Sequence, residues 1–252
     1  MTYRPSQERL TVQGALARGQ DIVDEMCPPE PQLLDTCVLQ NLDWVDRQRE
    51  RAGTVVWDDD AVRSLERRYG SELASDLLDL GTLYTQFEAR SGYPWLACRA
   101  SVDEATRLLG ARGPRLREMI EFLIRHQDEW TDDAYAGLAK GLLARSGRRR
   151  VSPLILKALG VASEEEIHTD NGPLAFLPDL GDRLIAACAL TANIPVILTT
   201  DLATFWKHRE SMASLGVQVM RPSELLPLYD RYWAALDAQG ARDSSTNASQ
   251  HK

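Results

Sequence analysis

This 252-residue chain lacks the features that mark several large protein classes. It has no apolar run that would span a bilayer, because its most apolar stretch, 184–198, is short and contains Asn193 and Pro195. Its first ten residues hold no apolar core, so we expect no secretory signal. Its four cysteines form no CxxC pair and have no paired histidines nearby, which argues against a disulfide framework or a zinc site. We therefore expect a cytoplasmic globular protein with no membrane association.

Nucleotide-cofactor and hydrolase motifs are also missing. The chain contains no G-x-x-x-x-G-K-[ST], no G-x-G-x-x-G and no G-x-S-x-G. What is present is an ordinary globular composition, with 44% apolar and 26% charged residues. A chain of this length forms one large domain or two small ones.

The acidic excess is concentrated in one segment. The formal net charge is −8, and residues 163–201 alone carry seven acids and one base. Such a run is either a solvated helix end or loop, or a set of acids that hold cations while arginines meet phosphates. The basic run Arg148, Arg149 and Arg150 is the candidate nucleic-acid contact.

Apolar patterning predicts short buried strands between helices. Unalternating apolar runs are typical of strands in a parallel sheet that is covered on both faces. We expect strands at 32–39, 94–98, 194–199 and 216–220, and helices at 5–26, over most of 58–160, and at 182–190, 202–212 and 222–236. This order predicts an α/β fold of three layers, α/β/α, with a central parallel sheet and a largely helical insertion.

The predicted organisation has three parts. Residues 1–31 form an N-terminal helical extension, and residues 32–236 form the α/β domain. Within that domain, about 55–92 and 114–160 are expected to be helical insertions. Residues 237–252 are a polar tail with little to bury, and we expect it to be disordered.

Four carboxylates are candidates for a site, because ligands of parallel α/β sheets bind beyond the carboxyl ends of the strands. Asp35 lies within an apolar run, where an unpaired carboxylate is costly to bury. Asp201 follows a predicted strand, Asp182 opens a predicted helix, and Glu104 ends a Ser-x-x-Glu segment. Each also has a structural explanation: loop hydrogen bonds for Asp35, helix capping for Asp201, a favourable interaction with the helix dipole for Asp182, and a capping box for Glu104.

Taken together, the four acids favour a cation site. Converging carboxylates repel one another unless a cation holds them, and Mg²⁺ and Mn²⁺ prefer such oxygen ligands. A site of this kind can orient a phosphodiester and lower the pKa of a bound water. None of the four histidines is placed as an obvious base.

Several segments resemble those of the PIN-domain ribonucleases. The run 33–39, LLDTCVL, is similar to the family's opening strand with its first catalytic aspartate. The run 181–189, GDRLIAACA, resembles its helix beginning D-x-x-I-A-A-x-A, and 197–201, ILTTD, resembles its T-x-D strand end. Segments 216–219 and 222–226 are similar to its closing strand and helix.

The resemblance implies a metal-dependent endoribonuclease. Asp35, Asp182 and Asp201, with Glu104 as the second acid and Asp103 as its fallback, would bind Mg²⁺ or Mn²⁺. A metal-activated water would attack the phosphorus and leave 5′-phosphate and 3′-hydroxyl ends. Many bacterial members of the family are toxins held silent by an antitoxin, and many form dimers, so an antitoxin and a homodimer are expected partners besides RNA.

Two other interpretations remain open at this stage. The segment around Asp182 also looks like the late motif of haloacid-dehalogenase-type phosphatases, which need an early Asp-x-Asp; here Cys37 stands where the second carboxylate is required. The other alternative is a non-catalytic PIN-like module whose helical insertions bind RNA or protein.

Overall fold

The computed structural model of the chain describes residues 26–52, 57–90, 94–107, 112–130, 142 and 151–250. The chain divides into two compact units, and the larger unit, Pro29–Leu226, contains the sheet. The described part of the other unit is mainly the C-terminal helix from Pro227 onward. The expected helix at 5–26 lies outside the described residues. Among the helices described, none is long and apolar enough to cross a membrane.

Short strands alternate with many helices along the described chain. The strands are β1 (Gln32–Leu34), β2 (Trp95–Leu96), β3 (Val196–Leu198) and β4 (Gln218–Met220). The helices before β3 are α2 (Thr36–Ala52), α3 (Asp59–Tyr69), α4 (Ser71–Ala89), α5 (Arg99–Arg107), α6 (Arg112–Trp130), α8 (Pro153–Leu159), α9 (Glu164–Ile167) and α10 (Leu180–Ala192). The last two are α11 (Arg209–Ser214) and α12 (Pro222–Gln250).

The four strands form one parallel sheet in the order β2–β1–β3–β4. From β1 the chain passes to β2 on one side, whereas β3 and β4 lie on the other side. The carboxyl ends of β1 and β3 therefore form a topological switch point, the place where open α/β sheets bind ligands. The mixed α/β class with a parallel sheet is confirmed.

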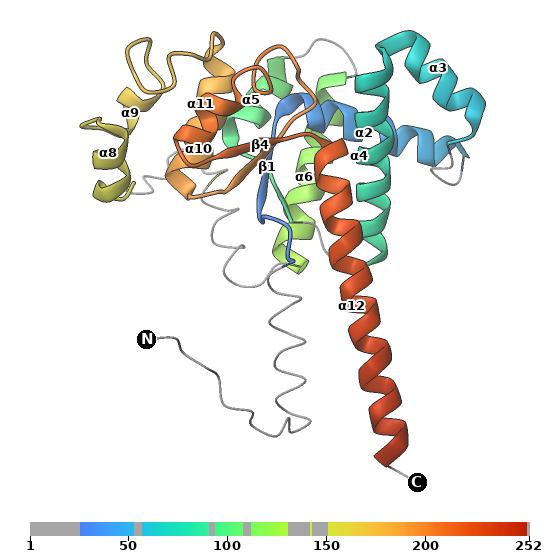
Figure 1. The fold of residues 1–252 in the computed structure, drawn as a ribbon. Helices are drawn as coiled ribbons and strands as arrows, with labels where there is room; N and C mark the ends of the chain where they lie inside the picture. Colours follow the sequence, from blue (N-terminus) through green and yellow to red (C-terminus); the bar gives the residue numbers. More distant parts are fainter. Residues whose placement is uncertain are drawn as a thin grey trace, which may run out of the picture. The chain divides into compact units, whose positions relative to one another are not determined.

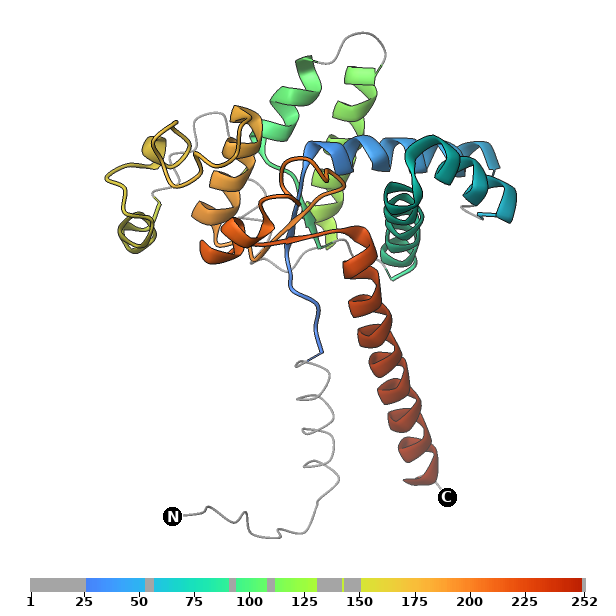
Figure 2. The ribbon, with the colours of Figure 1, turned by 45° about the horizontal axis from the view of Figure 1, so that its top comes forward.

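Helices cover both faces of the sheet (Figures 1 and 2). One face contributes Leu33, Leu96, Ile197 and Val219, one side chain from each strand, to a buried core shared with α10 and α11. On the other face, α6 packs against β2, and α2 packs against both α4 and α6. Burying both faces explains why the strands are continuous apolar runs rather than alternating ones.

Helices α3 and α4 occupy the first expected insertion and have a small core of their own. Asp58 caps α3 by accepting a hydrogen bond from the backbone of Ala61 at 2.8 Å. Gly70, with φ of 81°, separates the two helices in a conformation that suits glycine. A small buried cluster of Leu65, Ala74 and Leu77 packs them together. In the second insertion, α6 and α8 are helical, and residues between them lie mostly outside the described part.

The first strand is shorter than expected. Residues 32–39 were predicted to be one strand, but β1 ends at Leu34 and α2 begins at Thr36. The backbone carbonyl of Asp35 accepts hydrogen bonds from Val38 and Leu39, so the apolar run turns directly into a helix. This correction moves Asp35 from the middle of a strand to its carboxyl end.

Three helix boundaries also differ from expectation. Helix α5 begins at Arg99, so the Ser-x-x-Glu segment lies inside the helix and is not a capping box. The segment 202–208 is a series of turns, and the helix after it, α11, begins only at Arg209. Helix α12 extends to Gln250 instead of ending near 236, although most residues of 237–250 are weak helix formers.

Candidate functional site

Asp35 lies at the centre of a buried polar group at the carboxyl end of β1. Its side chain is only 4% exposed. The Cys37 thiol and the Thr199 hydroxyl both donate to the same oxygen, Oδ2, each at 2.8 Å. No Lys, Arg or His in the described part of the chain forms an ion pair with this carboxylate.

Burial dominates the electrostatics of Asp35. Loss of water around the carboxylate raises its pKa to about 6, and the nearby charge of Asp201 adds to the rise. The hydrogen bonds from Cys37 and Thr199 act in the opposite direction but are outweighed. A carboxylate held in this state is stabilised by any cation brought near it.

Asp201 is fixed at the end of β3 by its own loop. Its Oδ1 accepts from the backbone of Ala203 at 2.8 Å, and its Oδ2 accepts from the Thr204 hydroxyl. Its backbone N–H donates to the Thr199 hydroxyl at 2.9 Å, so Thr199 connects Asp201 to Asp35. Asp201 thus accepts hydrogen bonds as a capping residue does, but it caps a turn and not a helix.

Asp182 does not cap α10. Asp179 has that role, since its Oδ1 accepts from the backbones of Gly181 at 2.7 Å and Asp182 at 3.4 Å. Burial, followed by the charges of Asp35, Asp179 and Asp201, raises the pKa of Asp182 to about 7, and a hydrogen bond from Thr204 opposes this. The structure therefore brings three predicted acids from three separate segments within electrostatic reach of one another.

Glu104 approaches the same place from α5. A Cβ atom placed on Gly181 would lie 3.8 Å from Oε2 of Glu104 and 2.8 Å from Oδ1 of Asp179. The Asp179 carboxylate would have to shift for any side chain at position 181, and Glu104 lies within ordinary contact distance of the first turn of α10, which also carries Asp182. The fallback acid Asp103 instead forms an ion pair with Arg99 at 2.7 Å, so the geometry favours Glu104 over Asp103.

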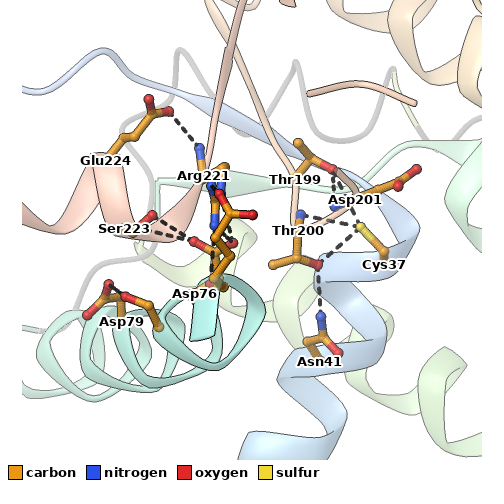
Figure 3. Close-up of polar contacts among 12 residues, drawn as sticks. Cys37, Asn41, Asp76, Asp79, Thr199, Thr200, Asp201, Arg221, Ser223 and Glu224 are labelled. Carbon is orange, nitrogen blue, oxygen red and sulfur yellow. Dashed lines mark hydrogen bonds and ion pairs between the residues drawn. The ribbon is translucent and has the colours of Figure 1, made fainter. Parts of the chain in front are cut away.

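Residues that sequence reasoning did not single out connect these acids. Asn41 on α2 donates to the Thr200 hydroxyl at 2.8 Å, and Thr200 donates to the Cys37 sulfur at 3.2 Å (Figure 3). Thr199 and Thr204 hold the aspartates directly. Two residues around the acids had a sequence signal: Thr199 is the threonine of the T-x-D match, and an aspartate directly before the first helical residue, as Asp179 is, is a common N-cap.

A second polar group lies at the carboxyl end of β4. Figure 3 shows it next to the first group, with Asp76 on α4 facing Arg221. Asp76 is fully buried and accepts from Arg221 Nε and Nη2, both at 2.8 Å, and from the Ser223 hydroxyl at 2.7 Å. Arg221 also pairs with Glu72 at 3.1 Å. This group fastens the inserted helix α4 to the sheet.

The oxygen ligands of these acids suit a hard divalent cation, but the positions of their donor atoms do not yet form a metal site. Within the described residues, no three His, Cys, Asp or Glu side chains have their donor atoms gathered for a metal ion. Their oxygens are turned toward protein donors, which is how uncompensated carboxylates reduce mutual repulsion. The donor set itself is all oxygen, and the buried Thr36 hydroxyl beside Asp35 has no partner in the described part.

The arginines expected to contact nucleic acid, Arg148, Arg149 and Arg150, lie outside the described residues.

Comparison of the chain with protein-family models, with curated proteins and with solved structures gives no match in any of the three. The resemblance to PIN-domain ribonucleases therefore stays a prediction.

Proposed function

We propose that this chain is a Mg²⁺- or Mn²⁺-dependent endoribonuclease with a PIN-like arrangement of its α/β domain. The observation that carries the proposal is the gathering of Asp35, Asp182 and Asp201 at the switch point of the sheet, where none of them has a basic partner among the described residues. Carboxylates with raised pKa values at the carboxyl ends of strands are typical of functional sites, and burying them lowers the stability of the fold.

Each acid would have a defined part in the reaction. Asp35, Asp182 and Asp201, with Glu104 beside them, would hold the cation. When bound, the ion neutralises phosphate charge and lowers the pKa of a water. Thr199 and Cys37 keep one oxygen of Asp35 occupied and so orient the other. Ala203 and Thr204 hold one oxygen of Asp201 each and fix the whole carboxylate.

The surface next to Asp201 suits an anionic substrate. The turns that follow Asp201 carry the exposed Lys207, and α11 begins with the exposed Arg209, whose guanidinium lies 4.5 Å from the ring centre of Trp206. Phe205 anchors this segment in the core, where it is fully buried. These side chains are placed to contact a phosphate backbone that approaches the acids.

The phosphatase alternative loses support from Cys37. A haloacid-dehalogenase-type mechanism needs a second carboxylate there, but a thiol donates to Asp35 instead, and burial raises its pKa well above the usual value. It therefore cannot take the part of that acid at neutral pH. The non-catalytic alternative predicts binding without cleavage and is tested with the nuclease.

The test compares the wild-type protein with an Asp35→Asn/Asp201→Asn double variant. Both are incubated with a labelled pool of structured and unstructured RNAs in Mn²⁺, Mg²⁺ or EDTA. We expect metal-dependent cleavage with 5′-phosphate ends, and a fall of at least about a hundredfold in the variant. An Asp60→Asn variant, changed at an exposed position of α3, should cut like the wild type.

Absence of cleavage, together with absence of Mn²⁺ binding by calorimetry, would contradict the proposal. RNA binding without cleavage would favour the non-catalytic module. A toxin role with a cognate antitoxin, and a homodimer, remain predictions from the family resemblance.

A further inference from the structure

A pocket of about 470 Å³ borders Asp201, within the range of sites that bind small organic groups. One wall is the end of α3 and the start of α4, residues 69–73. The other wall is the loop 200–203 after β3. The inserted helices therefore complete a cavity whose opposite wall includes a candidate catalytic acid, Asp201.

Tyr69 is the aromatic residue of this pocket. It is one of the few large apolar side chains exposed on the described surface, with 37% of its area accessible. The guanidinium of Arg68 lies 5.1 Å from its ring centre. An exposed aromatic ring with an arginine against it is a recurrent platform for nucleic-acid bases.

The charges of the pocket favour a base over a phosphate. Two carboxylates, Glu72 and Asp201, line it, and none of its lining residues is basic. Glu72 pairs with Arg221 through Oε1 at 3.1 Å and leaves its other oxygen, Oε2, without a donor in the described part. That oxygen suits the exocyclic amino group of a base, which donates hydrogen bonds to carboxylates. A phosphate attached to such a base would extend out of the pocket toward the acids.

We propose that this pocket binds one base of the RNA strand, stacked on Tyr69, next to the phosphodiester that is cut. This inference rests on the proposed ribonuclease activity and assigns a part in substrate binding to the helical insertion. It places Tyr69 and Arg68 as binding residues and leaves the chemical step to the acids.

The test measures binding and cleavage separately. Single-stranded RNA carrying 2-aminopurine, which bears an exocyclic amino group and loses fluorescence on stacking, is titrated into an Asp35→Asn/Asp182→Asn background. Tyr69→Ala should weaken binding about tenfold and abolish the quenching, because stacking of one base contributes that much affinity. Tyr69→Phe and Tyr69→Trp should retain both.

In the cleaving protein, Tyr69→Ala should raise KM about tenfold and change kcat little. Arg68→Ala should raise KM less, and the neighbouring Arg67→Ala serves as its control, because the Arg67 guanidinium donates to the backbone of Arg63 whereas that of Arg68 lies over the Tyr69 ring. Thermal unfolding of each variant identifies any that fail to fold, and Tyr69→Phe tests the ring in a minimally changed protein.

The outcomes separate this inference from the proposed function. If Tyr69→Ala still cuts RNA with the KM of the parent protein and still quenches 2-aminopurine in the binding assay, the base pocket is overturned and the nuclease stands. Tyr69-dependent quenching in a protein that cuts no RNA would support the pocket and overturn the nuclease. Neither quenching nor cleavage would overturn both.

Discussion

Asp35 and Asp76 are two buried aspartates of the same unit that are held in opposite ways. Asp76 is paired with Arg221 and Ser223, so its charge is balanced inside the protein. Asp35 has only uncharged donors, namely a thiol, a hydroxyl and the backbone of Thr36, and no basic side chain of the described chain neutralises it. The first arrangement fastens a helix to the sheet, whereas the second leaves a charge that an external cation can balance.

The largest expected effect is on the free energy of unfolding, and it distinguishes Asp76 from Asp35. Asp76→Ala leaves the Arg221 guanidinium buried and without its main partner, so the free energy of unfolding should fall by about 3–5 kcal/mol. Urea denaturation measures the change. Asp60→Ala, which removes an aspartate from the exposed pair with Arg63, should have little effect. If Asp76→Ala and Asp60→Ala lowered the free energy of unfolding by the same small amount, Asp76 would not be the aspartate that stabilises the fold.

Asp35→Asn should act in the opposite direction on the metal-free protein. The folded-state pKa of Asp35, about 6, lies above its ordinary value of 3.8, so folding disfavours the charged form. This penalty is absent below about pH 4 and complete above about pH 7, where removing the charge should add up to about 3 kcal/mol. Both donors meet one oxygen, which the asparagine carbonyl can replace.

Thermal unfolding in EDTA at pH 4.5 and pH 8 measures this difference. Asp35→Asn should be more stable than the wild type by about 1 kcal/mol at pH 4.5 and by about 3 kcal/mol at pH 8, while losing cleavage. A variant that is less stable than the wild type by the same amount at both pH values would contradict the account.

The smallest expected effect concerns the thiol. Because the Cys37 hydrogen bond lowers the pKa of Asp35, Cys37→Ala should move the acid limb of the cleavage pH profile upward by up to about one pH unit. Cys37→Ser keeps a donor and should stay near the wild type. A serine variant that shifts the profile more than alanine does would count against this role.

Sequence alone located the acids better than it located their surroundings. The apolar runs gave the parallel sheet, and its strand ends directed attention to Asp35 and Asp201, because periodicity and strand-end logic are local signals. The turn from β1 into α2 was not predicted, since an apolar run of eight residues reads alike as a strand or as a buried helix start.

The contacts among the acids could not be predicted, because they join residues far apart in the chain. Thr199 meets Asp35 across 164 positions, and Asp76 meets Arg221 across 145. Glu104 lies beside Gly181 only because α5 and α10 pack together. No sequence spacing contains this information, so the paired and unpaired aspartates looked alike until the fold was known.

The most direct test of the central claim, that the acids at the ends of β1 and β3 bind a cation, is calorimetric titration of EDTA-stripped protein with Mn²⁺ at pH 6 and pH 8. The pKa values of Asp35 and Asp182 predict tighter binding at pH 8 and proton release at pH 6. Asp35→Asn/Asp182→Asn should lose the binding and Asp60→Asn should keep it. Binding that is unchanged in the double variant, or absent from the wild type at both pH values, would contradict the account.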